Sequence, residues 1–234
     1  MTWIVLSLVS ALVLGLYDLA KKHAVADNAV LPVLFFSNLA SALVWLGLMA
    51  AEPFLPAAAQ VQPLGGFEHL QLFAKAALVG SSWICAYFAL KHLPVSIVGP
   101  IRATGPAWTI VGAVLLFAER PSGQQWFGMA LTLVSFVGLS FAGRKEGIRF
   151  HRDGWVGLVI VATLLGAASG LYDKFLLGSG RFSPATVQAW FSIYLTVFFA
   201  PLAYGWKRQW WPRSPFRWRW SIPGIGLLLL VADF

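Results

Sequence analysis

Two aspartates in identical local sequences are the strongest candidates for chemistry in this chain. The tetrapeptide Gly-Leu-Tyr-Asp occupies residues 15–18 and recurs at residues 170–173, each time near the C-terminal end of an apolar run. A carboxylate on an apolar membrane helix is costly unless it is paired or faces water, so it marks a pathway for a substrate or ion. Corresponding acids in two halves of a chain are typical of a duplicated transporter. Four residues therefore become pathway candidates: Tyr17, Asp18, Tyr172 and Asp173.

The sequence offers Asp18 a local partner that it does not offer Asp173. Lys21 and Lys22 follow Asp18 by three and four residues, so on a helix they share its face and could form an ordinary ion pair. Lys174 is adjacent to Asp173 and would point elsewhere. Asp173 therefore needs a partner from another helix or a wet cavity, whereas both a pathway role and a local pair are open for Asp18. If transport is coupled to protons, these two carboxylates would titrate.

Arg102 lies in the middle of an apolar run, between Pro100 and Pro106. Prolines free backbone carbonyls, and broken membrane helices are tolerated where they line a cavity. A fixed guanidinium at such a break would suit a carboxylate or phosphate on a substrate. The alternative is an interhelical ion pair with Asp18 or Asp173.

Aromatic and other charged residues in the apolar runs give weaker signals. Trp83, Tyr87 and Trp108 could line a cavity, although aromatic side chains in membrane helices more often pack. Glu119 closes one run, where an architectural role is expected. Lys75 begins another run, where its ammonium would reach back to the interface.

The sequence contains no arrangement that indicates an enzyme. The four histidines are scattered over the ends of apolar runs, so we expect no metal site. A glycine-rich phosphate loop and an HExxH motif are both absent from the sequence. We therefore predict neither a cofactor nor catalysis.

Composition indicates that lipid, rather than water, surrounds most of the chain. Of its 234 residues, 59% are hydrophobic and 11% are charged, and the mean hydropathy is +0.73. Soluble domains carry about 25% charged residues. The net charge of +8 comes from basic residues between apolar runs, a distribution typical of membrane-flanking loops rather than of a nucleic-acid surface. The expected partners are the lipid bilayer and a small-molecule substrate, with no nucleic acid and with self-association left open.

The apolar runs predict an all-α polytopic membrane protein. A helix that crosses a bilayer needs about 20 apolar residues, and seven runs qualify: residues 2–20, 29–51, 71–93, 95–118, 124–142, 155–177 and 184–204. An eighth run, residues 222–234, would reach only about 20 Å and is a partial span. Basic residues concentrate at the ends that follow odd-numbered spans, which places the N-terminus outside the cytoplasm.

One connection, residues 205–221, interleaves arginine and lysine with tryptophan. Tryptophan with arginine at the end of an apolar run marks the headgroup layer of a membrane. The segment is either a general interfacial anchor or a specific site for anionic lipid.

An ordered set of motifs resembles the EamA domain of the drug/metabolite transporter superfamily. The set consists of YFAL at residues 87–90, VGPIRATGP at 98–106, LLFAER at 115–120 and QWFG at 125–128. On this resemblance, residues 1–142 form a first five-helix repeat, 143–154 an inter-repeat loop and 155–234 a partial second repeat. Members of that family are drawn with both termini inside, unlike the orientation that the charges favour here.

The resemblance implies a secondary carrier of two inverted repeats with a central cavity and alternating access. Such carriers move amino acids, sugars, nucleotide-related metabolites or drugs. We therefore expect a multi-pass transporter of a small polar metabolite or drug in the cytoplasmic (inner) membrane. The alternative is a non-transporting membrane scaffold or a lipid-handling partner subunit, motivated by the basic tryptophan-rich segment and by the incomplete second repeat.

Overall fold

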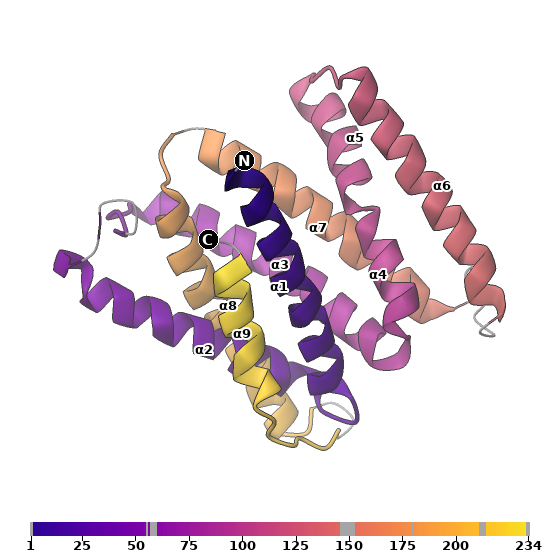
Figure 1. Ribbon diagram of the computed structural model, residues 1–234. Coiled ribbons are helices and arrows are strands. Elements are labelled where there is room, and N and C mark those ends of the chain that lie inside the picture. The colour runs from indigo at the N-terminus through magenta and orange to yellow at the C-terminus, as the bar shows by residue number, and fades with distance from the viewer. Residues whose placement is uncertain are drawn as a thin grey trace. The chain divides into compact units, whose positions relative to one another are not determined.

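Every regular element in the described part of the chain is a helix (Figure 1). The computed structural model describes residues 2–54, 56, 60–145, 153–178, 180–210 and 214–232. The helices are α1 (Thr2–Val25), α2 (Val30–Ala50), η1 (Glu52–Phe54), α3 (Gly66–His92), α4 (Val95–Ala103), α5 (Gly105–Phe117), α6 (Gly123–Lys145), α7 (Gly154–Gly178), α8 (Pro184–Lys207) and α9 (Ser221–Ala232).

The prediction of an all-α membrane protein is confirmed, and each expected apolar run corresponds to a helix or, for residues 95–118, to two. Within the described residues, five stretches are long and apolar enough to cross a membrane: α2, α3, α4 with α5, α7 and α8. The runs at residues 2–20 and 124–142 coincide with α1 and α6. Their crossing of the membrane, the count of seven full spans and a partial eighth, and the inverted layout stay predictions.

Local sequence explains where several helices begin and end. The Ser183 side chain accepts a hydrogen bond from the Thr186 backbone N–H, and Pro184 occupies the first turn, so α8 begins with a side-chain cap and a residue that lacks the N–H. Ala118 adopts a left-handed conformation (φ 52°) that ends α5. These boundaries bring polar groups to the ends of otherwise apolar helices.

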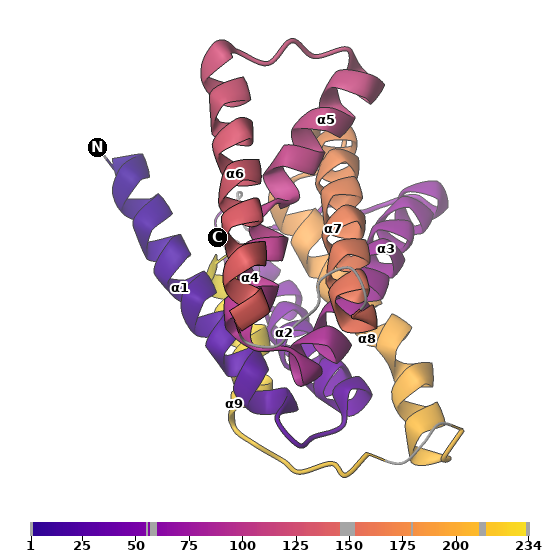
Figure 2. The same ribbon diagram turned by 90° about the vertical axis from the view of Figure 1, so that its right-hand side faces the viewer.

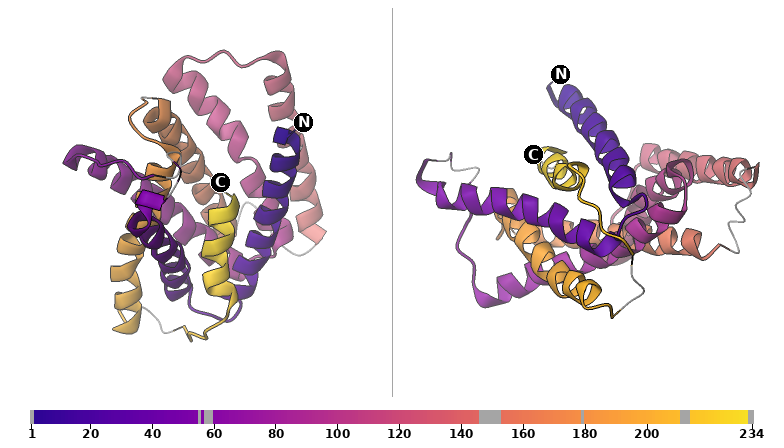
Figure 3. Two further views of the ribbon diagram at one scale, coloured as in Figure 1. Left: turned by 60° about the vertical axis from the view of Figure 1, so that its left-hand side comes forward. Right: turned by 90° about the horizontal axis from the view of Figure 1, so that it is seen from below.

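Packing divides the chain into two compact units, which we describe separately. Unit 1 comprises residues 1–80 and 181–234, and unit 2 comprises residues 81–180, so α3 contributes to both. In unit 1, α2 packs against α8 and α9, and α1 lies along α9 (Figure 3). The indole of Trp45 is fully buried against Ala185 and Ala189 of α8. A Cβ atom at Gly226 would lie 2.1 Å from the Ser37 carbonyl oxygen, so glycine is what allows α9 to approach α2 this closely.

Unit 2 contains the broken helix α4–α5, which packs against α7 (Figure 2). Its apolar core joins the end of α3 and α4 to the start of α7 through eight buried residues, Ala89, Leu90, Leu93, Ile97, Val98, Ile101, Val156 and Val159. The buried Ser82 hydroxyl donates to the Ala162 carbonyl of α7 at 2.7 Å. This core holds α4 and the start of α7 against the end of α3.

The two units do not follow the predicted repeat boundaries. Helix α7, expected to open the second repeat, packs on α4 and α5 of the first. The expected loop at residues 143–154 is helical as far as Lys145, and its residues 146–152 lie outside the described part of the chain. A sequence repeat is defined by similarity along the chain, whereas these units are defined by contacts between residues. The units therefore do not test the repeat assignment, which stays a prediction.

Candidate functional site

The long apolar run at residues 95–118 breaks at Thr104, two residues after Arg102. Pro106 lacks the N–H that would otherwise bond to the Arg102 carbonyl one turn earlier. The Thr104 backbone N–H and its hydroxyl both donate to the Ile101 carbonyl, at 3.1 Å and 2.7 Å. The hydroxyl thus helps to close α4 where the regular ladder ends. A break beside Arg102 is what the flanking prolines predicted.

Two adjoining pockets of unit 2 follow the line where α5 meets α7, and we call them together the α5–α7 groove. One, of about 540 Å³, contains Arg102 and Thr163, and the other, of about 430 Å³, contains Glu119 and Lys174. Thr109 and Ile110 line both pockets, so the two pockets adjoin each other. The groove therefore carries polar and charged groups along much of a helix that is apolar on its other faces. Its further polar lining residues are Arg120 and Gln125.

Glycines bring α5 and α7 close enough to form the floor of this groove. A Cβ atom at Gly112 would lie 2.2 Å from Leu171 Cδ1. A Cβ atom at Gly170 would lie 3.9 Å from the Thr109 side chain. Close approach through small residues is how membrane helices pack, since lipid supplies no hydrophobic drive between them. The second copy of the repeated tetrapeptide thus takes part in the groove through its glycine and leucine.

An ion pair closes one end of the groove. Glu119, just beyond the left-handed Ala118, pairs with the ammonium of Lys174 on α7. The two side chains are 44% and 47% exposed, and the same ammonium lies 5.6 Å from the Phe117 ring centroid. Glu119 was expected to be architectural, and the structure shows that it ties the end of α5 to α7. Sequence reasoning missed Lys174, because its partner is 55 residues away.

The second aspartate lies on α7, beside the groove-lining residues Gly170, Leu171 and Lys174. One carboxylate oxygen of Asp173 is buried, and the rest of its side chain is half-buried. The interhelical ion pair between Arg102 and Asp173, which the sequence left open, stays a prediction.

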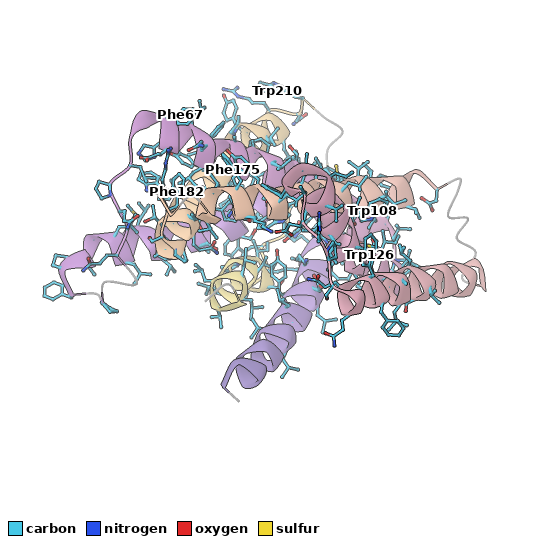
Figure 4. The ribbon with its side chains drawn as sticks, turned by 90° about the horizontal axis from the view of Figure 1, so that it is seen from above. Phe67, Trp108, Trp126, Phe175, Phe182 and Trp210 are labelled. Atoms are coloured by element: carbon cyan, nitrogen blue, oxygen red, sulfur yellow. The ribbon has the colours of Figure 1, made fainter. Side chains whose placement is uncertain are left out.

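The remaining candidates of unit 2 are four aromatic residues, Trp83, Tyr87, Trp108 and Tyr172. Tyr172 stacks on Phe175 one turn further along α7, with ring centroids 6.1 Å apart. Tyr87 is buried, Trp83 is half-buried and Trp108 is 42% exposed. Figure 4 labels Trp108 among the side chains of this unit. None of these four aromatic candidates lines the described α5–α7 groove. Their part in a pathway stays a prediction.

The first copy of the tetrapeptide has different surroundings. In unit 1, Asp18 forms an ion pair with Lys21, and its side chain is 53% exposed. The Lys21 ammonium also lies 4.0 Å from the ring centroid of Tyr17, which is buried. The local pair that the sequence allowed is thus the one observed. A role of Asp18 in transport stays a prediction.

Unit 1 holds a second polar cluster that sequence reasoning missed. Lys75 is 7% exposed, and its ammonium lies 4.7 Å from the Phe191 ring centroid. The predicted reach of this ammonium to the membrane interface stays a prediction. Helix α3 begins at Gly66, which puts Lys75 about 14 Å along it. The Tyr194 hydroxyl and His69 Nδ1 are 2.7 Å apart nearby on the same two helices. The spacing of His69 and Lys75 on one helix was visible in the sequence, but their α8 partners were not.

No group of three or more metal-ligating side chains occurs among the described residues.

The profile of the EamA-like transporter family matches residues 1–141. The chain belongs to this family. The suspected resemblance is confirmed, and the match ends next to the predicted first-repeat boundary at residue 142. No curated protein matches the chain significantly. Family membership together with the five long apolar helices makes this chain a multi-pass membrane protein and a transporter of the drug/metabolite type. Members of the family are generally not enzymes.

Proposed function

We propose that the protein is a secondary carrier that moves a small polar metabolite bearing a carboxylate or phosphate group across the cytoplasmic membrane. The observation that carries this proposal is the position of Arg102 at the break between α4 and α5, where it lines an open pocket. A guanidinium keeps its charge in nearly any environment and offers paired donors that match a carboxylate or phosphate. A charge inside an apolar span is otherwise costly, so its most economical explanation is contact with a solute.

The size and lining of the α5–α7 groove support a metabolite rather than an inorganic ion. Its two adjoining pockets of about 430 Å³ and 540 Å³ lie within the usual range of about 300–1,000 Å³ for ligand pockets. The hydroxyl of Thr109 lies between Arg102 at one end and Glu119 with Lys174 at the other. A solute with several polar groups would find donors and acceptors along this line.

The broken helix also supplies a hinge for alternating access. Helices α4 and α5 meet at Thr104, where the regular backbone ladder is interrupted. Hinges are residues at the ends of elements that absorb changes in backbone angles. A change at Thr104 would move Arg102 relative to α5, so binding at the guanidinium and opening of the pathway would be coupled.

Proton coupling is a separate hypothesis, motivated by Asp173. Its partly buried carboxylate lies on a span that borders the groove. Carboxylates in such positions form the proton relays of many pumps and transporters. Transport by Asp173→Asn that remained equally driven by a pH gradient would eliminate this hypothesis.

The proposal is tested by uptake into proteoliposomes that contain the whole chain. A panel of labelled amino acids, sugars and nucleotides identifies a substrate that is taken up saturably. Arg102→Gln should then lower uptake of an anionic substrate by about a hundredfold, the scale of a lost charge-assisted contact, and Arg102→Lys should restore part of it. Arg181→Gln, an exposed arginine outside the groove, serves as the matched control.

Two results would contradict the proposal. Equal uptake by the Arg102→Gln variant and the unchanged protein would remove Arg102 from substrate binding. Absence of saturable uptake for every solute in the panel would favour a non-transporting membrane scaffold or partner subunit.

A further inference from the structure

The end of unit 1 where α1 and α8 finish gathers tryptophan and basic side chains that the transport proposal does not use. An extended segment of residues 214–220 runs from the end of α8 past the end of α1 to α9 (Figure 2). We call the exposed side chains of this region the tryptophan–arginine surface: Lys207, Arg208, Trp210, Arg217, Trp218 and Trp220.

A buried asparagine fixes the backbone of this segment. Asn28, fully buried between α1 and α2, accepts from the Arg217 N–H at 2.9 Å and donates to the Arg217 carbonyl at 2.8 Å. The same amide donates to the Ala24 carbonyl at the end of α1. One side chain thus pairs both backbone groups of Arg217 in the manner of a neighbouring peptide. The side chain of Arg217 is exposed, while its backbone is held in place by Asn28.

Two further contacts attach the segment to α1. The Arg219 guanidinium donates to the His23 carbonyl, where a cation satisfies an unpaired carbonyl at the C-terminus of the helix. His23 Nδ1 and the Ser221 hydroxyl are 3.0 Å apart. Arg219 is therefore used within the unit, and its neighbours Trp218 and Trp220 remain exposed.

A chain of aromatic contacts continues the surface to the end of α8. Trp206 contacts Phe216, and Phe216 stacks on Phe36 of α2, with centroids 6.0 Å and 5.6 Å apart. Phe36 also meets Trp218 edge to face at 5.6 Å. Trp206 Nε1 donates to the Ser214 carbonyl at 3.2 Å. These contacts hold the segment beside Lys207 and Arg208.

The tryptophan–arginine surface exposes large aromatic side chains next to basic ones. Trp210, Trp218 and Trp220 are 67%, 52% and 82% exposed, and Figure 4 shows Trp210 projecting beyond the ribbon. Lys207 and Arg208 are exposed, and Arg208 Nε donates to the Tyr204 hydroxyl at 2.7 Å. The exposed acid of the adjoining α1–α2 turn is Asp27. The exposed cations outnumber it.

We propose that the tryptophan–arginine surface is a binding site for an anionic phospholipid, with the lipid phosphate and headgroup held by Arg208 and Arg217. Indole rings favour the headgroup layer because one edge is apolar and the other carries an N–H donor. Arginine forms paired hydrogen bonds to phosphate oxygens. A general anchor needs only exposed tryptophans, whereas here Asn28 fixes the backbone that carries Arg217 and the Tyr204 hydroxyl holds the guanidinium of Arg208. This inference does not depend on the transport proposal.

The test compares retention of phosphatidylglycerol with retention of phosphatidylcholine by native mass spectrometry of the purified whole chain in detergent. The unchanged protein should retain phosphatidylglycerol at least tenfold more tightly. Arg208→Gln with Arg217→Gln should reduce that preference by roughly fivefold for each cation removed. Arg181→Gln removes one charge from an exposed arginine elsewhere and should leave the preference unchanged, whereas Arg208→Gln and Arg217→Gln should each lower it when made singly.

A second variant keeps the proposal open to contradiction if the double arginine variant fails to fold. Trp218→Ala with Trp220→Ala keeps all the cations, so it should weaken retention of both lipids while preserving the preference for phosphatidylglycerol. Equal retention of the two lipids by the unchanged protein would overturn the proposal and leave a general interfacial anchor. A loss of preference in Arg181→Gln as large as in Arg208→Gln and in Arg217→Gln would overturn it as well, because net charge alone would then explain the selectivity.

Discussion

The two copies of Gly-Leu-Tyr-Asp share four residues but not their surroundings. Asp18 is half-exposed and paired with Lys21 on its own helix. Asp173 has a buried carboxylate oxygen and no lysine one turn later, where Leu176 stands. The residue after the motif also differs, since Leu19 corresponds to Lys174. The same acid is therefore neutralised locally in one copy and placed beside a groove in the other.

The leucine and the glycine are also more closely packed in the second copy than in the first. Leu16 is 57% exposed, whereas Leu171 is buried against the space left by Gly112. A Cβ atom at Gly15 would meet nothing within 4 Å, while one at Gly170 would approach Thr109. The first copy thus borders open surroundings, and the second is part of a helix contact. Identity within a repeat fixes the position of a motif in its helix, but the residues packed against it decide what the motif does.

The largest expected effect separates the two aspartates. Asp173→Asn should lower the maximal uptake rate in proteoliposomes by about a hundredfold, because it removes a charge placed beside the groove in a membrane span. Asp18→Asn should change the rate by less than about twofold, since it breaks only a half-exposed pair. Equal losses in both variants would show that the copies act alike and would contradict the comparison.

The leucines should differ in stability. Leu171→Ala removes a buried side chain at the contact between α5 and α7 and should cost about 2 kcal/mol of unfolding free energy. Leu16→Ala changes an exposed side chain and should cost less than about 0.5 kcal/mol. The measurement is unfolding in mixed micelles with increasing denaturing detergent. A larger loss for Leu16→Ala would mean that the first copy is packed in a way that the structure does not show.

The smallest effect concerns the residue at which the copies diverge. Lys174→Leu gives the second copy the residue of the first and removes the ion pair with Glu119. Because both partners are nearly half exposed, the coupling should be only about 0.5 kcal/mol. A double-mutant cycle with Glu119→Gln measures it in the same micelles. Coupling above about 2 kcal/mol would indicate a pair shielded from water.

Most of the helices could be predicted because their signals are local. The run at residues 184–204 begins with Pro184 directly after Ser183, and α8 begins at that proline with Ser183 as its cap. The break beside Arg102 was visible from Pro100 and Pro106, since proline acts on the backbone of its own helix. Helix α3 begins five residues before the predicted span because polar residues such as Glu68 and His69 can occupy a helix end outside the apolar run.

The composition of the groove and of the lipid surface could not be predicted, because both depend on contacts between distant segments. Glu119 finds Lys174, and Asn28 finds the backbone of Arg217, which is 189 residues away. Each of these side chains could instead interact with a residue nearer in sequence or with solvent. Only the packing of the helices selects among them.

Access of water to the α5–α7 groove within the membrane is the most direct test of a transport pathway in this protein. Cys85 is the single cysteine, so Cys85→Ser gives a background without reactive thiols. Thr109→Cys, in the groove, and Val111→Cys, exposed two residues further along α5, lie at nearly the same depth. We expect a small charged maleimide to label the cysteine at position 109 in proteoliposomes but not the one at position 111, which we expect to face lipid. Labelling of neither position, or of position 111 alone, would contradict a water-filled pathway along this groove.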